Sequence, residues 1–358
     1  MTDLLNRRQL GRSTLARQHL LAREPGSAIE MIEHLGGMQS QAPLAPYVGL
    51  WTRILGFDPA ELSELTQTRE VVRLPLMRNT VHLVSAHDAL GWRPLFGPLH
   101  AAEYRGHFPG GIDGVDLDEL LTLAHKLLEE EPHTRAELGR ILARRWPTAD
   151  PNALSYAVTH HLPLCQVPPR GVWGHAGAAA WTPLGSWLGA SPHAVSVGDL
   201  VLRYLGAFGP ASVADMQLWS GLNRLGEVVE RLPLRTFRGE DGQTLYDIPH
   251  APRPDPDAPA PPRFLPAYDN VLLSHKDRRR LIPHDRSVPL PPGNGIDVGT
   301  VLLDGLWQGT WRARDDRLQI TVFRPVTSIE RSAVLEEGAR LGAFLRPESR
   351  YNVDLVVT

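Results

Sequence analysis

Two neighbouring stretches, Val71-Val72-Arg73-Leu74-Pro75-Leu76 and Asn79-Thr80-Val81-His82-Leu83-Val84, decide how the N-terminal part of this chain folds. Both are rich in β-branched residues, and the short turn between them predicts a β-hairpin. Apolar residues at helical spacing predict helices before the hairpin, at residues 4–22, 27–35 and 45–54, with another beginning at Asp58. Short helices followed by a hairpin are typical of a winged-helix domain. We therefore expect a first winged-helix domain over residues 1–115, with a loop-rich segment at 86–115.

Two later segments repeat this order of helices and a hairpin. In residues 116–195, Thr134 and Glu137 have the spacing of a capping box at a helix start. Residues 167–174, with Pro-Arg-Gly at their centre, predict the hairpin wing of a second winged-helix domain. A third such domain is expected over residues 196–248. Its expected elements are helices at 197–205, near 212–219 and at 224–232, and strands at 234–237 and 244–248.

The last third of the chain has a different character. Residues 249–262 hold seven prolines and predict an extended linker. In residues 263–358, Asp304-Gly305 between two apolar runs predicts a hairpin turn. A helix is expected at 328–345 and a last strand at 351–357. The segment therefore reads as a β-rich module with one long helix, and the fold class of the whole chain is α+β.

Composition limits the possible functions. The chain has 358 residues, 42% of them hydrophobic and 22% charged, which is typical of a multi-domain globular protein. Cys165 is the only cysteine, which excludes a disulfide framework and a cysteine zinc site. No apolar stretch approaches the roughly 18 residues of a membrane span, and we expect a cytoplasmic protein. A net charge of −3 requires any path for DNA to be local.

The most informative polar stretch is Gly36-Gly37-Met38-Gln39-Ser40-Gln41-Ala42-Pro43. The two glycines end the preceding helix, and Pro43 favours an extended conformation before it. Residues two apart on an extended segment point to the same side, so Gln39 and Gln41 converge while Ser40 faces away. Two neutral amides can then act on one group. The alternative is a polar turn that caps the helix.

Other polar residues are weaker candidates. His82, with Arg78 and Asn79 before it, is either a site neighbour or a hydrogen-bonded core histidine. Arg278, Arg279 and Arg280 follow closely on Tyr268, Asp269 and Asn270. This basic run fits a phosphate clamp or a solvated turn. His160-His161 has no third ligand at metal spacing, so no metal is expected.

The ordered set of stretches resembles the AlkZ/YcaQ group of bacterial winged-helix DNA glycosylases. The matching pieces are GGMQSQ at 36–41, RNTVHLV at 78–84, VPPRGVWG at 167–174, GPASVAD at 209–215, LPAYDNVLLSHKDR at 265–278 and VLLDGLWQGTWR at 301–312. The resemblance implies three tandem winged helices plus a C-terminal β-barrel-like module around a DNA channel. It implies that Gln39 and Gln41 are the catalytic pair, as in the AlkZ branch. Ser40 departs from the apolar residue usual there.

The resemblance further implies removal of N7-alkylguanine from double-stranded DNA, including bulky adducts and interstrand crosslinks made by natural-product genotoxins. It implies a monofunctional enzyme without a cofactor, and we expect a monomer. A crosslinked base cannot rotate out of the duplex, so a narrow hairpin must approach it. Trp307, Gln308 and Thr310 are the expected DNA contacts on that hairpin. The alternative is a barrel hairpin whose tryptophans are core.

Two other functions remain open from the sequence. The first is a non-catalytic winged-helix transcriptional regulator, but the helix before Gln39 carries Glu30, Glu33 and His34, which suit phosphate binding poorly. The second is a hydrolase of modified nucleosides. A glycosylase leaves abasic sites in DNA, whereas a regulator only retards its migration.

Overall fold

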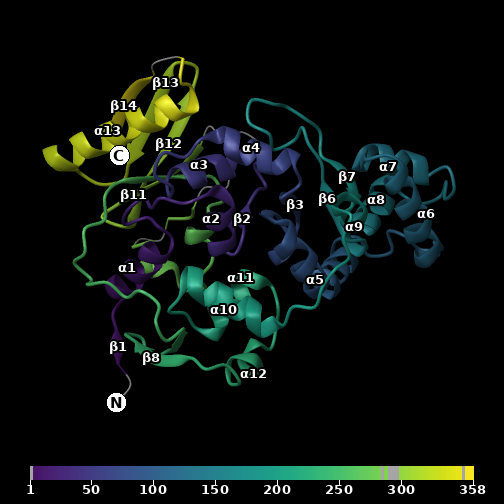
Figure 1. Ribbon diagram of the computed structural model, residues 1–358, viewed down its shortest axis with the longest axis horizontal. Helices are drawn as coiled ribbons and strands as arrows, with labels where there is room; N and C mark the ends of the chain where they lie inside the picture. Colours follow the sequence, from purple (N-terminus) through teal and green to yellow (C-terminus); the bar gives the residue numbers. More distant parts are fainter. Residues whose placement is uncertain (1–2, 284–285, 289–297, 349–350) are drawn as a thin grey trace. The chain divides into compact units, whose positions relative to one another are not determined.

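The computed structural model describes residues 3–283, 286–288, 298–348 and 351–358 (Figure 1). Contacts divide the chain into two compact units. The first consists of Met1–Asp58, Val201–Trp219 and Arg224–Thr358. The second consists of Pro59–Leu200 and Ser220–Asn223. The mixed α+β class is confirmed, and the five-segment division expected from the sequence stays a prediction.

The first unit begins with a short strand and three helices. Asn6 caps the first helix in a capping box with Gln9, and the helix ends at Gln18 before His19, whose φ is +51°. The helix expected at 4–22 is therefore shorter than predicted, because Asn6 starts it late and His19 leaves the helical region. The elements are β1 (Leu4–Leu5), α1 (Arg7–Arg17), α2 (Ala28–His34), β2 (Met38–Gln39) and α3 (Ala45–Trp51).

After the second unit, the chain returns to the first with three helices and a hairpin. Strand β8 pairs with β9 in antiparallel fashion and with β1 in parallel. The helices and strands expected between residues 197 and 248 are confirmed, although the helix at 224–232 is shorter than predicted. The elements are α10 (Val197–Phe208), α11 (Val213–Ser220), α12 (Leu225–Val229), β8 (Arg235–Gly239) and β9 (Thr244–Asp247).

The C-terminal part of the first unit is a sheet with strand order β10-β11-β12-β13-β14. Neighbours are antiparallel except β13 and β14. Among the described residues, the sheet is not closed into a barrel. The hairpin at Asp304-Gly305 and the helix at 328–345 are confirmed. The elements are β10 (Arg263–Pro266), β11 (Val298–Leu303), β12 (Leu306–Arg314), β13 (Arg317–Val322), α13 (Ser328–Leu345) and β14 (Asn352–Val357).

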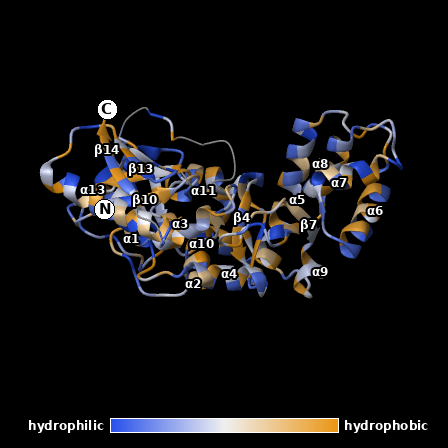
Figure 2. Ribbon diagram, turned by 90° about the horizontal axis from the view of Figure 1, so that it is seen from above, coloured by the Kyte–Doolittle hydropathy of each residue, from blue (hydrophilic) through white to orange (hydrophobic). Residues whose placement is uncertain are grey.

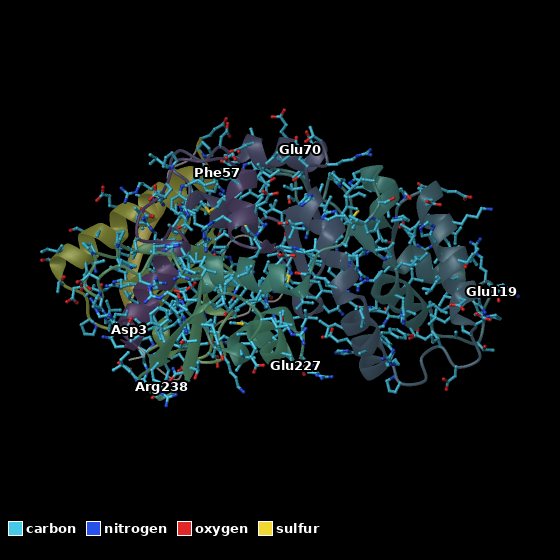
Figure 3. The ribbon with its side chains drawn as sticks, turned by 60° about the horizontal axis from the view of Figure 1, so that its bottom comes forward. Asp3, Phe57, Glu70, Glu119, Glu227 and Arg238 are labelled. Carbon is cyan, nitrogen blue, oxygen red and sulfur yellow. The ribbon has the colours of Figure 1, made fainter. Side chains whose placement is uncertain are left out.

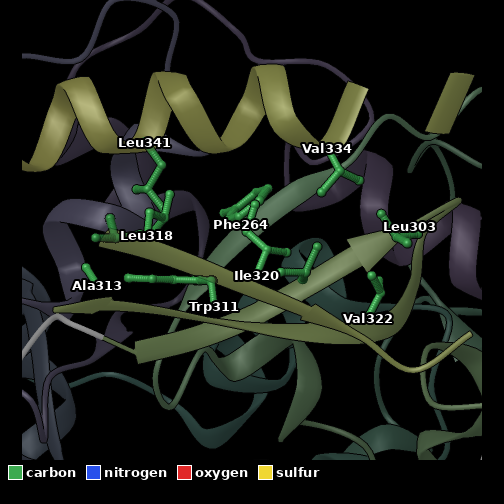
Figure 4. Close-up of a cluster of buried hydrophobic side chains, with 11 residues drawn as sticks. Phe264, Leu303, Trp311, Ala313, Leu318, Ile320, Val322, Val334 and Leu341 are labelled. Atoms are coloured by element: carbon green, nitrogen blue, oxygen red, sulfur yellow. The ribbon is translucent and has the colours of Figure 1, made fainter. Parts of the chain in front are cut away.

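This sheet is covered on both faces. Val334 and Leu341, seven residues apart on α13, pack over one face with Trp311 and Ile320 (Figure 4). On the other face Trp307 packs with residues that include Leu15 of α1 and Leu20, which follows that helix. A bulge between Val301 and Leu302 shifts the register, so that Trp307 pairs with Leu302 and Gly309 with Val301. This bulge puts the two tryptophans of β12 into different cores.

The second unit combines helices with a small set of antiparallel strands. Strands β4, β3, β6, β7 and β5 are hydrogen-bonded in that order. Helices α5 to α8 enclose the main core, to which α6 contributes Leu120, Ala124 and Leu128; Figure 2 shows apolar and polar residues alternating on that helix. The elements are α4 (Pro59–Gln67), β3 (Val71–Pro75), β4 (Val81–Ser85), α5 (Ala86–His107), α6 (Leu117–Glu130), β5 (His133–Thr134), α7 (Arg135–Leu142), α8 (Pro151–His161), β6 (Leu164–Gln166), β7 (Ala180–Pro183) and α9 (Leu184–Leu188).

Two expectations for this unit are wrong. Residues 86–107 are not loop-rich but form α5, a helix that contains Pro94 and Pro98. Each proline removes one N–H donor, and packing against α8 and β3 keeps the helix continuous. Residues 167–174, where a hairpin was expected, form only a loop. The strands that pair across this loop are β6, which precedes it, and β7, which follows it.

Both units carry acidic side chains on their surfaces. Glu70, Glu119 and Glu227 are exposed acids, and Figure 3 shows their side chains at the edge of the ribbon. Among the described residues, no helix is long and apolar enough to cross a membrane.

Candidate active site

The glutamine segment is shaped by the end of α2. Ser27 and Glu30 cap the start of this helix reciprocally. At its end, Gly36 and Gly37 have φ of +66° and +85°, which favours glycine, and the Gly37 N–H donates to Ile32 O at 2.9 Å. The chain then reverses into β2. The expected helix end at the two glycines is confirmed.

Burial alternates along the next three residues. Gln39 is half-buried, Ser40 is fully buried and Gln41 is exposed. The extended conformation is confirmed for Met38 and Gln39, but Gln41 lies at a bend. The inward direction of Ser40 agrees with the expected alternation. Its hydroxyl stands inside the fold, where the resemblance leads one to expect an apolar side chain.

Gln39 lines a small cavity in the first unit. The volume of this cavity is about 20 Å³, which is enough for a single water molecule. Gln39 Oε1 is buried, and it accepts no hydrogen bond from the residues that the structure describes. A buried carbonyl oxygen without a donor costs about 1–3 kcal/mol. The lining residues are Gln18, Leu35, Gly37, Met38, Gln39, Ala45, Pro46, Arg53, Phe208, Pro266, Asp269 and Asn270.

A buried ion pair forms one wall of this cavity. Arg53 binds Asp269 with two hydrogen bonds of 2.9 Å each, and both side chains are at most 5% exposed. Arg53 also donates to Gln18 Oε1 at 3.0 Å and to Gly49 O at 2.9 Å. Asp269 accepts the N–H of Val271 at 3.0 Å. The carboxyl group beside Gln39 is therefore paired with Arg53 and held in one orientation.

The structure thus brings Asp269 and Asn270 to the cavity of Gln39, as expected of site neighbours. Tyr268, just before them, adopts φ of +64°, a conformation that non-glycine residues seldom occupy. Gln41 does not line the cavity. Sequence reasoning missed Gln18 and Arg53. Arg53 and Asp269 are 216 positions apart, and no local pattern links them.

Three other candidates belong to the second unit. Arg78 and Asn79 both have φ of +53° in the turn between β3 and β4. His82 is fully buried, and its Nδ1 lies 2.8 Å from Thr80 O, so it donates there as the neutral ring. Burial, reinforced by the positive charge of Arg78, lowers the pKa of His82 to about 3. His82 therefore fits its alternative interpretation, a hydrogen-bonded core histidine.

The three arginines of the basic run have different environments. Arg280 is 5% exposed, and it donates to Pro210 O at 2.8 Å and to Thr14 at 3.3 Å. Arg279 is exposed but ion-paired with Asp277 and Asp241. Arg278 is exposed and forms no ion pair with the described residues. Three arginines were expected to form a phosphate clamp. Of these, Arg278 alone has an exposed charge that is not paired with another described residue and could contact a phosphate.

The hairpin contacts also separate by burial. Trp307 is 1% exposed, and its indole N–H donates to Gly309 O at 2.7 Å. This burial is the reason why Trp307 cannot stack on a base, and its expected DNA contact is corrected to a core role. Gln308 and Thr310 are partly exposed on β12. In the described part of the chain, no group of three or more His, Cys, Asp or Glu side chains could hold a metal ion.

Comparison with known proteins bears on both fold and activity. The family described as DNA glycosylase AlkZ-like matches residues 32–344. An interstrand DNA cross-link repair glycosylase from Streptomyces sahachiroi is 25% identical over 371 aligned residues, which cover 93% of this chain and 95% of that protein. The solved structure of Streptomyces sahachiroi DNA glycosylase AlkZ matches with a TM-score of 0.75 and 20% identity, over 98% of this chain and all of that one. At that identity the structural likeness concerns the fold.

Proposed function

Because the chain belongs to the AlkZ-like DNA glycosylase family, we propose that it hydrolyses the N-glycosidic bond of N7-alkylguanine in double-stranded DNA, with Gln39 and Gln41 as its catalytic pair. The observation that carries the proposal is the buried Gln39 Oε1, which lacks a donor beside a cavity the size of one water. The family match and the glycosylase relative favour this activity over a transcriptional regulator.

The chemistry requires little from a general acid. An N7-alkylguanine is cationic and leaves readily, so the enzyme has to stabilise the positive charge that develops on the sugar and position a water. The carbonyl oxygens of Gln39 and Gln41 can supply negative dipole ends for both tasks. Neither amide accepts a proton at neutral pH, so the pair acts by electrostatics and positioning.

The Arg53–Asp269 pair keeps the site rigid. Its bidentate geometry fixes one cavity wall, and the link from Arg53 to Gln18 extends that rigidity to the end of α1. A preorganised site loses no free energy to rearrangement at the moment of reaction. We propose Asp269 and Arg53 as positioning residues, not as acid or base.

The substrate range follows from the accessibility of the target bond. The relative from Streptomyces sahachiroi is an interstrand DNA cross-link repair glycosylase, and we propose that this chain also acts on bulky adducts or crosslinks. A crosslinked guanine cannot be extruded into a tight pocket, because it is tied to the opposite strand. Gln308 and Thr310 on β12, and Arg278, are the proposed DNA contacts.

The architecture completes the proposal. We propose that residues 1–115, 116–195 and 196–248 are winged-helix domains. We further propose that 249–262 is a linker and 263–358 a barrel-like module. The β8–β9 hairpin after α12 and the β3–β4 hairpin after α4 support the winged-helix interpretation. We further propose that the enzyme acts as a monomer in the cytoplasm.

The test is base release from duplex DNA that carries N7-methylguanine, measured in single turnover. Gln39→Ala and Gln41→Ala are expected to lower the rate by ~10²-fold or more, the effect of losing one preorganised dipole. Melting temperatures should stay near that of the wild type, because Gln41 is exposed and Gln39→Ala removes a buried carbonyl oxygen that accepts no hydrogen bond from the described residues. Gln67→Ala, an exposed glutamine on α4, is the matched control.

Near-wild-type rates in both glutamine variants would remove them from the catalytic centre. The same assay with a polycyclic N7 adduct tests the substrate range. The proposal expects the rate to hold as the N7 group grows, and a steep loss would restrict the enzyme to small adducts.

A further inference from the structure

The second unit contains a larger cavity that no step of the proposed reaction uses. Its volume is about 390 Å³, within the roughly 300–1,000 Å³ of small-molecule sites. The lining is mostly apolar, with one buried cation and two histidines. The lining residues come from α5, α6, α8, α9 and the segments beside them: Leu90, Arg93, Pro94, Gly97, His125, His161, Pro163, Pro183, Leu184, Gly185, Ser186 and Pro192.

Arg93 is the unusual member of this lining. It is 3% exposed, and its Nη2 donates to Leu162 O at 2.9 Å and to His160 O at 3.4 Å. Its Nε–H is buried and has no acceptor among the described residues. No carboxylate of the described chain lies within 4.0 Å of its guanidinium. A buried charge without a counter-charge is costly, so an anion that supplies one would be held strongly.

The space beside the guanidinium is open. Gly97 is one turn further along α5, and a Cβ placed on it would stand 3.8 Å from Arg93 Nη1. Burial lowers the pKa of Arg93 to about 10, which leaves the group charged at neutral pH. Glycine at this position therefore leaves room on α5 beside the Nη1 side of the guanidinium.

We propose that this cavity binds a small apolar molecule that carries one anionic group, a carboxylate or sulfonate on an aromatic or aliphatic body. Arg93 would bind the anion, and Leu90, Pro183 and Leu184 would contact the apolar body. One buried cation in a mostly apolar lining suits a ligand with a single negative charge. This binding function is separate from base excision.

The probe is 1-anilinonaphthalene-8-sulfonate, whose fluorescence rises in apolar surroundings, compared with N-phenyl-1-naphthylamine, the same ring system without the sulfonate. We expect saturable binding of one sulfonate dye per chain and about tenfold weaker binding of the neutral dye. Gly97→Leu places a side chain in the cavity beside Arg93 and should abolish binding of the sulfonate dye. Gly106→Leu, on the same helix but with nothing described within 4 Å of its Cβ, is the matched control and should bind like the wild type.

Arg93→Met should retain the neutral dye and lose about tenfold in affinity for the sulfonate. Melting temperature checks the fold of each variant, and the dye comparison on the wild type needs no variant. Equal binding of the two dyes would overturn the role of Arg93. Undiminished binding by Gly97→Leu would place the dye elsewhere and overturn the site.

Discussion

At the scale of single residues, the ion pair beside Gln39 lies inside the protein and not on its surface. Arg53 and Asp269 are both buried and meet in a bidentate pair. Removing one partner of such a pair leaves the other charge unsatisfied, which costs roughly 3–5 kcal/mol. The exposed pair of Arg145 and Glu119 is expected to contribute less than about 1 kcal/mol.

Asp269→Asn keeps an acceptor for the Val271 N–H but removes the charge that faces Arg53. We expect the free energy of unfolding to fall by roughly 3 kcal/mol, and a second change, Arg53→Met, to restore part of it. Denaturant unfolding measures both, with Arg145→Ala as the exposed control. A loss no larger than that of the control would contradict the importance of the pair.

His82 makes stability depend on pH. Its pKa is about 3 in the folded protein, against roughly 6.5 in an unfolded chain. Between these values the unfolded state binds one more proton, so stability falls as pH falls, by about 1.4 kcal/mol per unit. His82→Asn, whose amide can still donate to Thr80 O, should reduce the stability difference between about pH 7 and about pH 5 by roughly 2 kcal/mol.

The measurement is the free energy of unfolding at both pH values. His100, whose pKa burial also lowers to about 3, still titrates in the variant, so the pH dependence should be reduced and not abolished. Parallel pH profiles for wild type and variant would contradict a neutral buried His82.

At the scale of elements, the turn between β11 and β12 is tightly constrained. Asp304 and Gly305 have φ of +47° and +75°, and a Cβ on Gly305 would come within 2.5 Å of atoms of Arg12 and Leu15. Gly242, in the β8–β9 turn, has φ of +78° but nothing described within 4 Å of its Cβ.

Gly242→Ala should therefore cost only the left-handed strain, about 1 kcal/mol. Gly305→Ala adds overpacking, roughly 1–3 kcal/mol more. Thermal melting of the two variants separates these contributions. Equal losses would show that α1 yields to the added methyl group.

The same hairpin illustrates how much the sequence could predict. Asp-Gly between apolar runs identifies the turn, and helical spacing identifies α13, because both depend on local chemistry. The bulge that sends Trp307 and Trp311 to different cores depends on packing and leaves no local pattern. Likewise, the glycines and alternation predicted the setting of Gln39, but Arg53, which meets Asp269 across 216 residues, could not be found. Helix α5, where a loop-rich segment was expected, contains two prolines, and a helix tolerates prolines only where tertiary contacts support it.

At the scale of the whole molecule, the net charge of −3 opposes DNA binding unless basic residues act locally. Arg278 is exposed and without an ion pair in the described chain, whereas Arg279 and Arg280 are held by other groups. Arg278→Gln should reduce the slope of log affinity against log salt by about 0.9, the effect of one phosphate contact.

Fluorescence anisotropy with undamaged duplex DNA at several salt concentrations measures that slope. The control is Arg224→Gln, which changes an exposed arginine just before α12 that pairs with Glu227. An unchanged slope for Arg278→Gln would assign it to a solvated turn.

The discontinuous make-up of the first unit has a consequence for biosynthesis. Arg12 binds Asp304 and Arg17 binds Asp247, across 292 and 230 residues of chain. A ribosome delivers the first 58 residues long before these partners, whereas nearly all of the second unit emerges as one continuous segment. Domains generally fold as units during synthesis, and long-range pairing is slow. The second unit can thus fold first on the nascent chain, and the cavity of Gln39, which needs Phe208 and Asp269, is among the last features to form.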